Sequence, residues 1–162
     1  MLRSEHLLKI RIVAVGKNKD RWVSDGCAHF EKLLSRFALV EWSIVSPAKH
    51  SGSLSSQEIK KDEAKRLMSL LNKGTIIALS DIGKKVDSLS FSKILERVQI
   101  SSKGTVTFVI GGAYGLGDLV LSNANMILSL SSLTFSHQLV RLVLLEQLYR
   151  GFSILHGTDY HK

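Results

Sequence analysis

The sequence contains very little cysteine and proline. Cys27 is the single cysteine among 162 residues, which excludes an internal disulfide framework and a metal site built from cysteines. Its helical spacing from neighbouring apolar residues predicts that it lies in the core. Pro47 is the single proline, and charged residues make up 22% of the chain. No segment therefore has the composition of a disordered region or a flexible linker.

Long hydrophobic runs are also missing. The apolar stretch near the start of the chain is interrupted by Lys9 and Arg11, so it does not form the core of a signal peptide. No other stretch reaches the length that a membrane span requires. We therefore expect a cytoplasmic protein without a membrane partner, in which residues 1–6 form a frayed extension.

The sequence does contain enough apolar material for one domain. Apolar residues make up 44% of the chain, so we expect residues 1–162 to fold as a single unit with its own core. The formal net charge is +8 and the isoelectric point is about 9.7. This balance favours a polyanionic partner such as RNA, DNA or an acidic membrane surface, but charge alone does not choose among them.

Apolar strands alternate with amphipathic helices along the chain. The pattern predicts strands at 7–15, 39–45, 75–79 and 105–110, a strand ending at Leu130, a turn at 80–85, and helices within 22–37, 55–74, 88–98 and 136–156. This order predicts an α/β fold, a parallel-rich sheet flanked by helices on both faces. Ligands bind at the carboxyl ends of strands in such sheets, which points to the segments after Leu79, Ile110 and Leu130.

Two of these segments have the composition of a ligand-binding surface. Residues 111–117 (GGAYGLG) fit neither the dinucleotide fingerprint nor the P-loop, which disfavours a dinucleotide or ATP enzyme. Their glycines permit close approach of a ligand to the backbone, but a plain strand-to-helix turn would use them equally well. Residues 130–135 (LSSLTF) could offer backbone groups to an adenine edge, with Leu133 and Phe135 as an apolar wall. Thr134 or Ser136 could also cap the helix that follows, and both interpretations hold together.

The last predicted helix is apolar nearly all round. Such a helix must be buried in the core or against a second subunit, and we favour a dimer interface over the core. His137 and Arg141 lie four residues apart on one face, at the end nearest the two loops. Glu146 and Arg150 have the same spacing, which indicates an intrahelical ion pair.

The C-terminal tail, residues 156–162, is polar, aromatic and basic. Such a tail frays in many proteins. This one could instead fold over a site, with Tyr160 stacking on a base and Lys162 near a phosphate.

Several separated motifs in this order resemble one known family. They are Leu79-x-x-x-Gly83-Lys84, Phe108-Val109-Ile110-Gly111-Gly112-x-x-Gly115, Leu130-Ser131-x-Leu133-Thr134-x-x-His137, Arg141, Glu146-Gln147-x-Tyr149-Arg150 and Tyr160-His161-Lys162. The chain resembles the ribosomal large-subunit pseudouridine N3-methyltransferases of the SPOUT superfamily, from Lys9 to Lys162. Members of that family often have Asp where this chain has Ser80, although Asp81 follows directly.

The resemblance implies a fold, a cofactor and a partner. The C-terminal part of the α/β domain would be threaded into a trefoil knot, and the enzyme would be a homodimer without a metal. The substrate would be a pseudouridine of 23S rRNA in the assembled ribosome. S-adenosylmethionine would be held by Leu79, Gly111, Leu130, Ser131, Ser132, Leu133, Thr134 and Phe135, largely through backbone groups.

The resemblance also leads to hypotheses about residue roles. The N3 imide of pseudouridine is a weak acid, so Arg141 would stabilise its anion while His137 orients the base or relays a proton. The RNA would be bound by Arg150, Tyr160, His161 and Lys162, if these reach the partner subunit's site. Two alternatives stay open: a SPOUT enzyme that acts on tRNA, and a non-catalytic ribosome-associated module that binds no cofactor.

Overall fold

The computed structural model describes residues 7–49, 52–71, 74–101 and 104–162. The extension expected at residues 1–6 lies outside these ranges. None of the helices within them has the length and apolar character that a membrane crossing requires.

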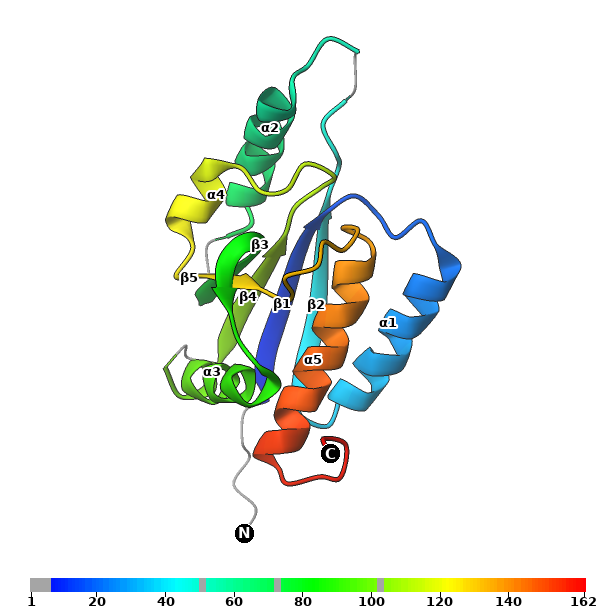
Figure 1. Cartoon of the computed structure of the whole chain (residues 1–162), viewed down its shortest axis with the longest axis vertical. Coiled ribbons are helices and arrows are strands. Elements are labelled where there is room, and N and C mark those ends of the chain that lie inside the picture. Colours follow the sequence, from blue (N-terminus) through cyan, green and yellow to red (C-terminus); the bar gives the residue numbers. More distant parts are fainter. Residues whose placement is uncertain (1–6, 50–51, 72–73, 102–103) are drawn as a thin grey trace.

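A five-stranded sheet forms the centre of the molecule (Figure 1). Its strands, in spatial order, are β2 (Ala38–Val45), β1 (Leu8–Val15), β4 (Thr105–Ile110), β3 (Thr75–Lys85) and β5 (Met126–Ser129). Every neighbouring pair is parallel, which confirms the predicted parallel sheet. The carboxyl ends of β4, β3 and β5 therefore meet at one edge of the sheet, as the sequence pattern predicts.

Helices cover both faces of this sheet. One face carries α1 (Arg21–Leu34), α3 (Ser88–Ser101) and α5 (Leu139–Leu155), with α5 packed between the other two. The opposite face carries α2 (Ser56–Met68) and the short α4 (Asp118–Asn123), which pack on each other. Because successive strand side chains point to opposite faces, each strand contributes to both layers of the core. In β1, for example, Ile12 belongs to the α5 side and Val13 to the α2 side.

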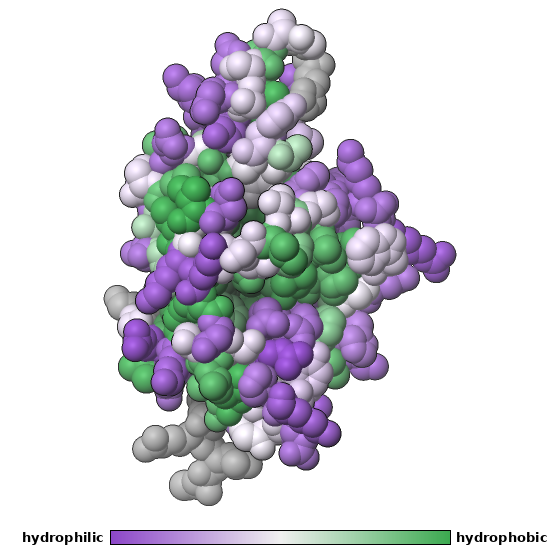
Figure 2. Space-filling model, viewed as in Figure 1, coloured by the Kyte–Doolittle hydropathy of each residue, from purple (hydrophilic) through white to green (hydrophobic). Residues whose placement is uncertain are grey.

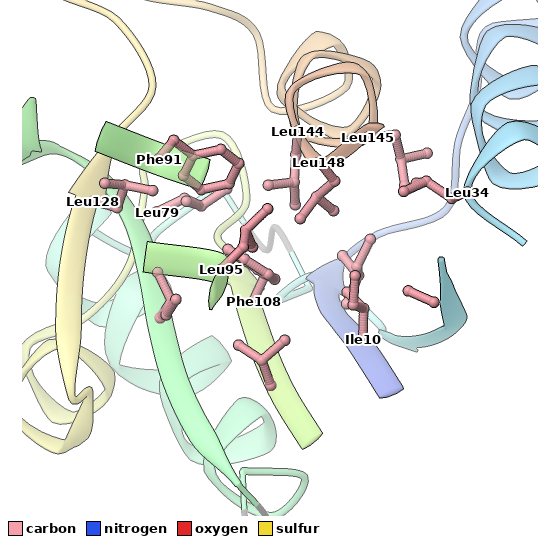
Figure 3. Close-up of a cluster of buried hydrophobic side chains, with 14 of the residues drawn as sticks. Ile10, Leu34, Leu79, Phe91, Leu95, Phe108, Leu128, Leu144, Leu145 and Leu148 are labelled. Carbon is pink, nitrogen blue, oxygen red and sulfur yellow. The ribbon is translucent and has the colours of Figure 1, made fainter. Parts of the chain in front are cut away.

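Helix α5 is part of the core of the single chain. Its residues Leu144, Leu145, Leu148 and Phe152 are fully buried, and Figure 3 shows Leu144 and Leu148 pointing toward the sheet and Leu145 lying beside Leu34 of α1. The expectation that this helix is not core is therefore wrong for the side that packs on the sheet, α1 and α3. An apolar helix alone does not reveal which surface covers it, and residues such as Leu142 and Val143 are only partly buried within the single chain. A dimer interface on this remaining surface stays a prediction. The homodimer and the knot stay predictions.

Strand β3 is longer than the sequence pattern indicates. Residues 80–85 were expected to form a turn, but they extend the strand, with an irregularity at which Leu128 of β5 pairs with both Leu79 and Lys84. Gly83 permits this arrangement, because a Cβ atom there would lie 2.5 Å from the carbonyl carbon of Leu128. The sequence pattern also missed α4, which is short and buries only Val120.

One predicted helix cap is confirmed. Ser55 and Glu58 form a reciprocal capping box at the start of α2, with the Glu58 N–H 3.2 Å from the Ser55 Oγ. Helix α5 begins at Leu139, and its N-cap is Gln138, which makes no side-chain cap bond, so the cap expected at Thr134 or Ser136 does not occupy the N-cap position. Ser136 does accept a hydrogen bond from the Leu139 N–H at 3.2 Å, within the turn that carries His137.

Candidate functional site

A cavity of about 510 Å³ opens where β3, β4 and β5 end. Three chain segments line it: residues 79–81, residues 110–116, and residues 129–131 and 133–137 with Val140 beyond them. The volume lies within the usual range for a small-molecule or cofactor site. Segments far apart in the sequence thus meet at the strand ends that the pattern indicated.

The glycine segment forms the tight turn that closes one side of this cavity. Gly115 donates its N–H to the Gly112 carbonyl oxygen at 3.1 Å, and its φ of 84° lies in the left-handed region. A Cβ atom at Gly111 would lie 2.6 Å from the carbonyl carbon of Gly115. The turn leads into α4, so these glycines both connect a strand to a helix and bring backbone to the cavity.

The Ser/Thr/Phe loop forms the opposite side. Ser129 donates its hydroxyl to the Ser131 carbonyl oxygen at 2.9 Å, and the Leu133 N–H donates to the Ser131 Oγ at 2.9 Å. These bonds fix the shape of the loop, in which Leu133 lines the cavity and is 74% exposed. A fixed loop of this kind can present backbone groups and an apolar wall to a ligand together.

Most residues expected to hold the cofactor line this cavity. They are Leu79, Gly111, Leu130, Ser131, Leu133, Thr134 and Phe135, whereas Ser132 is exposed outside it. Sequence reasoning missed Tyr114 and Val140, which also line it. The position of Tyr114 inside the glycine segment was a usable signal for a lining residue.

Ser80 stands where members of the resembling family often have Asp, but a carboxylate is still present at Asp81. Both Ser80 and Asp81 line the cavity, and the Ser80 hydroxyl donates to the Asp81 Oδ1 at 3.3 Å. S-adenosylmethionine has a cationic sulfur, an apolar and aromatic adenosine part and polar ends, and the cavity combines a carboxylate, apolar side chains and close backbone. The residues present therefore fit this cofactor.

His137 lines the cavity, in the turn before α5, and is half-buried. Burial lowers the pKa of its imidazole below the ordinary value of 6.5, and the positive charges of Arg141 and Lys19 lower it further. Each of these effects disfavours the protonated ring. The imidazole is therefore neutral at pH 7 and is able to accept a proton.

Arg141 does not reach the cavity. Its side chain is 1% exposed, and its guanidinium donates to the carbonyl oxygens of Val15 at 2.8 Å and Gly16 at 2.6 Å. A third bond joins it to the Asn18 Oδ1 at 2.8 Å. The structure thus separates the two residues that spacing had placed on one catalytic face, and it uses Arg141 to tie α5 to the loop after β1.

The residues expected to bind RNA gather at the other end of α5 (Figure 1). Arg150 and Glu146 form the predicted intrahelical ion pair, with 2.6 Å between the Arg150 Nη2 and the Glu146 Oε1. Tyr160 folds back over them, donating its hydroxyl to the same carboxylate at 3.0 Å, while the Arg150 guanidinium lies 4.7 Å from the centre of its ring. His161 approaches Arg150 at 3.5 Å, and Lys162 is exposed. Within one chain, this cluster does not contribute to the cavity.

Among the described residues, no three His, Cys, Asp or Glu side chains gather in a way that could hold a metal ion.

The chain is similar to known methyltransferases over nearly its whole length. A family model described as "Predicted SPOUT methyltransferase" matches residues 8–161. Proteins named "Ribosomal RNA large subunit methyltransferase H" from Acetivibrio thermocellus and Enterococcus faecalis are 43% and 41% identical to it. Each alignment covers 96% of this chain and 100% of the relative.

Solved structures support the same fold. A "probable methylase family protein" from Haemophilus influenzae superposes with a TM-score of 0.58 at 16% identity, covering 94% of this chain and 70% of that one. A "Probable Methyltransferase" from Bordetella pertussis also gives 0.58, at 12% identity, covering 93% of this chain and 99% of that one.

Proposed function

This chain belongs to the SPOUT methyltransferase family, and we propose that it methylates the RNA of the large ribosomal subunit. The acceptor atom is N3 of a pseudouridine in 23S rRNA of the assembled ribosome, and the methyl donor is S-adenosylmethionine. The observation that carries this proposal is the identity of 43% with a large-subunit rRNA methyltransferase along the entire length of that relative.

The cavity at the ends of β3, β4 and β5 is the proposed site for S-adenosylmethionine. Leu79 and Leu133 would enclose its apolar part, and the backbone around Gly111 and Ser131 would contact its polar edges. Asp81 would lie near its positive charge. Bound there, the cofactor would supply an electrophilic methyl group on a sulfonium, which the acceptor nitrogen would take by in-line displacement of the sulfur.

His137 is the residue that we propose acts on the acceptor base. It lines the cavity and is neutral at pH 7, so it can accept the N3 proton or hold the base through a hydrogen bond. Its contribution is also one of alignment, because transfer requires the nitrogen to face the methyl group at close range.

Arg141 does not stabilise the N3 anion in this proposal, although the sequence suggested that role. Its guanidinium is already bonded to three oxygens and is buried away from the cavity. We therefore propose Arg141 as a positioning residue: it lowers the pKa of His137 and fixes the loop that follows β1.

The C-terminal cluster of Arg150, Tyr160, His161 and Lys162 remains the proposed RNA-binding tail. Because it lies at the far end of α5 from its own cavity, it would serve the site of a second subunit. The homodimer is thus a part of the proposal.

Cofactor binding is tested by thermal unfolding in the presence of S-adenosylmethionine or S-adenosylhomocysteine. A ligand that binds only the folded state raises the melting temperature, and at a hundredfold excess over Kd the gain is about 2.7 kcal/mol. Absence of a shift with either ligand would favour the non-catalytic module.

The substrate is tested by mass mapping of ribosomal RNA from cells with and without the gene. The proposal expects one methyl group to disappear from one pseudouridine of 23S rRNA when the gene is deleted. A methyl group lost from tRNA instead, with 23S rRNA unchanged, would support the rival SPOUT activity.

A further inference from the structure

The loop between β1 and α1, residues 16–20, lies next to the active site that we propose. Two buried side chains at the start of α5 hold its backbone. Arg141 bonds to the carbonyl oxygens of Val15 and Gly16, as described above. Gln138, only 8% exposed, donates its amide to the Lys17 carbonyl oxygen at 3.1 Å and accepts the Lys19 N–H at 3.2 Å. The loop is therefore fixed to the same turn that carries His137.

This anchoring leaves two lysine side chains free to meet a ligand. Lys17 and Lys19 are both exposed, and neither forms an ion pair within the part of the chain that the structure describes. Asp20 is the acidic residue of the loop, and it lies at the N-cap of α1. The fixed backbone keeps the roots of both side chains at this edge, and their flexible four-carbon stems allow the two ammonium groups to reach a phosphate there.

The lysines are close to the reacting end of the cavity. Lys19 binds Gln138 through its backbone N–H, and Gln138 is the neighbour of His137 in the chain. The charge of Lys19 also reaches His137, since it is one of the three causes that lower the pKa of that imidazole. Figure 2 shows the hydrophilic surface over this loop beside a hydrophobic area over the start of α5. The loop that carries Lys17 and Lys19 thus adjoins the hydrophobic surface at the start of α5.

We propose that Lys17 and Lys19 form a phosphate-binding edge of the active site, which holds the RNA backbone next to the nucleotide whose base reaches His137. This inference rests on the proposed function, because it names the contacts of the same RNA substrate. A nucleotide can present its base to the cavity only if its flanking phosphates lie at the rim. Ammonium groups are suited to contacts with such phosphates, which position the substrate without reading its sequence.

The test measures methyl transfer to large subunits or ribosomes from cells that lack the gene. The variant is Lys17→Ala with Lys19→Ala, and the charge-keeping partner is Lys17→Arg with Lys19→Arg. The matched control is Lys93→Ala with Arg97→Ala, which removes the same charge from the exposed face of α3. Binding of S-adenosylmethionine is measured by calorimetry for every variant, and the oligomeric state by size-exclusion chromatography.

We expect the alanine pair to lower kcat/KM for the ribosomal substrate by roughly tenfold or more, while cofactor affinity and oligomeric state stay unchanged. The slope of log KM against log salt should fall by about two, one for each lost phosphate contact. The arginine pair should retain most of the activity, and the α3 control should match the wild type.

Two results would overturn the inference alone. The first is wild-type kcat/KM and salt slope in the alanine pair. The second is dissociation of the alanine pair into monomers, which would assign the lysines to contacts with a second copy of the chain. A wild-type protein that leaves rRNA unmethylated would overturn the proposed function, and with it this inference.

Discussion

At the scale of single residues, burial decides which side chains have unusual chemistry. The core position predicted for Cys27 is confirmed: the residue is 3% exposed, and burial with the nearby Glu31 raises the pKa of its thiol to about 11. The same physical effect acts in the opposite direction on His137, because there the protonated form is the charged one. The first residue is therefore an inert core thiol, while the second is a neutral imidazole at the edge of a cavity.

Replacing His137 by glutamine is expected to abolish most turnover while cofactor binding persists. Proton transfer by a positioned side chain contributes roughly 10²- to 10⁴-fold, so kcat should fall by an amount in that range. Single-turnover methylation of ribosomes measures the change, and calorimetry with S-adenosylmethionine is the control. Full turnover in His137→Gln would remove this residue from the mechanism.

The pH dependence of His137 follows from the direction of its pKa shift. Its folded-state pKa lies below the unfolded value of about 6.5, so protonation favours the unfolded chain. The neutral His137 imidazole therefore contributes its full stability above pH 6.5, and this contribution is lost as the pH falls through the folded-state pKa. In the wild type, kcat/KM should likewise stay level at neutral pH and fall only below pH 6.5.

At the scale of elements, buried polar contacts and glycine turns determine how strands and helices join. Arg141 ties α5 to the end of β1, and the Gly111–Gly115 turn ties β4 to α4. Neither connection is visible in the hydrophobic pattern, because each depends on a backbone group rather than on an apolar side chain. The glycine turn lines the cavity, and Arg141 of α5 lies one helical turn beyond His137, so each connection is expected to affect function through geometry.

Arg141→Met is expected to lower the free energy of unfolding by about 3 kcal/mol, because it leaves buried carbonyl oxygens without a donor. Denaturant unfolding measures this loss. Arg150→Met is the matched control; its partly exposed ion pair with Glu146 should contribute no more than about 1 kcal/mol. As a positioning residue, Arg141 should also influence His137, so NMR titration should give a higher imidazole pKa in Arg141→Met. An unchanged titration would limit Arg141 to a structural role.

Gly111→Ala is expected to weaken the binding of S-adenosylmethionine by roughly tenfold or more, since a shift of even an ångström in the turn removes well-placed contacts. The new Cβ would overlap the Gly115 backbone, which must move. Gly104→Ala is the control at the other end of β4. Its φ of 83° makes alanine strained there too, but nothing lies within 4 Å of the added atom. If both variants bind the cofactor equally well, the turn does not shape the site.

At the scale of the whole molecule, the two ends of α5 carry different parts of the proposed site. The helix has 17 residues and is therefore about 25 Å long. The cavity lies beside its first turn, and the tail packs on its last. A single chain cannot bring these two regions together, so a site that uses both requires a second subunit.

Mixed dimers test this arrangement directly. One subunit carries His137→Gln with an intact tail, and the other keeps His137 but lacks residues 158–162. Each parent homodimer should be inactive toward ribosomes, whereas the mixed dimer should recover activity at one of its two sites. Affinity tags on the two chains allow the mixed species to be isolated and assayed. No recovery would mean that the tail does not act on the partner's site.

The order and type of the main elements could be predicted from local patterns. Strands such as β1 and β4 are short apolar runs, and the capping box of α2 appears in the sequence as Ser55 and Glu58. The cavity itself was predictable in part, because parallel strands place their carboxyl ends together and the residues after Leu79, Ile110 and Leu130 were therefore candidates. The short α4 and the extension of β3 through Lys85 depend on tertiary pairing, so local patterns missed both.

The sequence alone thus determined the sheet, the segments that form the cavity and the family to which the chain belongs, since these depend on apolar periodicity and on motifs along the chain. Tertiary structure decided the direction of each polar side chain. The four-residue spacing of His137 and Arg141 could not reveal that one lies at the cavity and the other bonds to β1. Nor could it show that α5 packs on α1 and α3 of its own chain, or that two lysines are held beside the proposed active site. Those outcomes depend on contacts between residues far apart in the sequence, such as Arg141 with Val15.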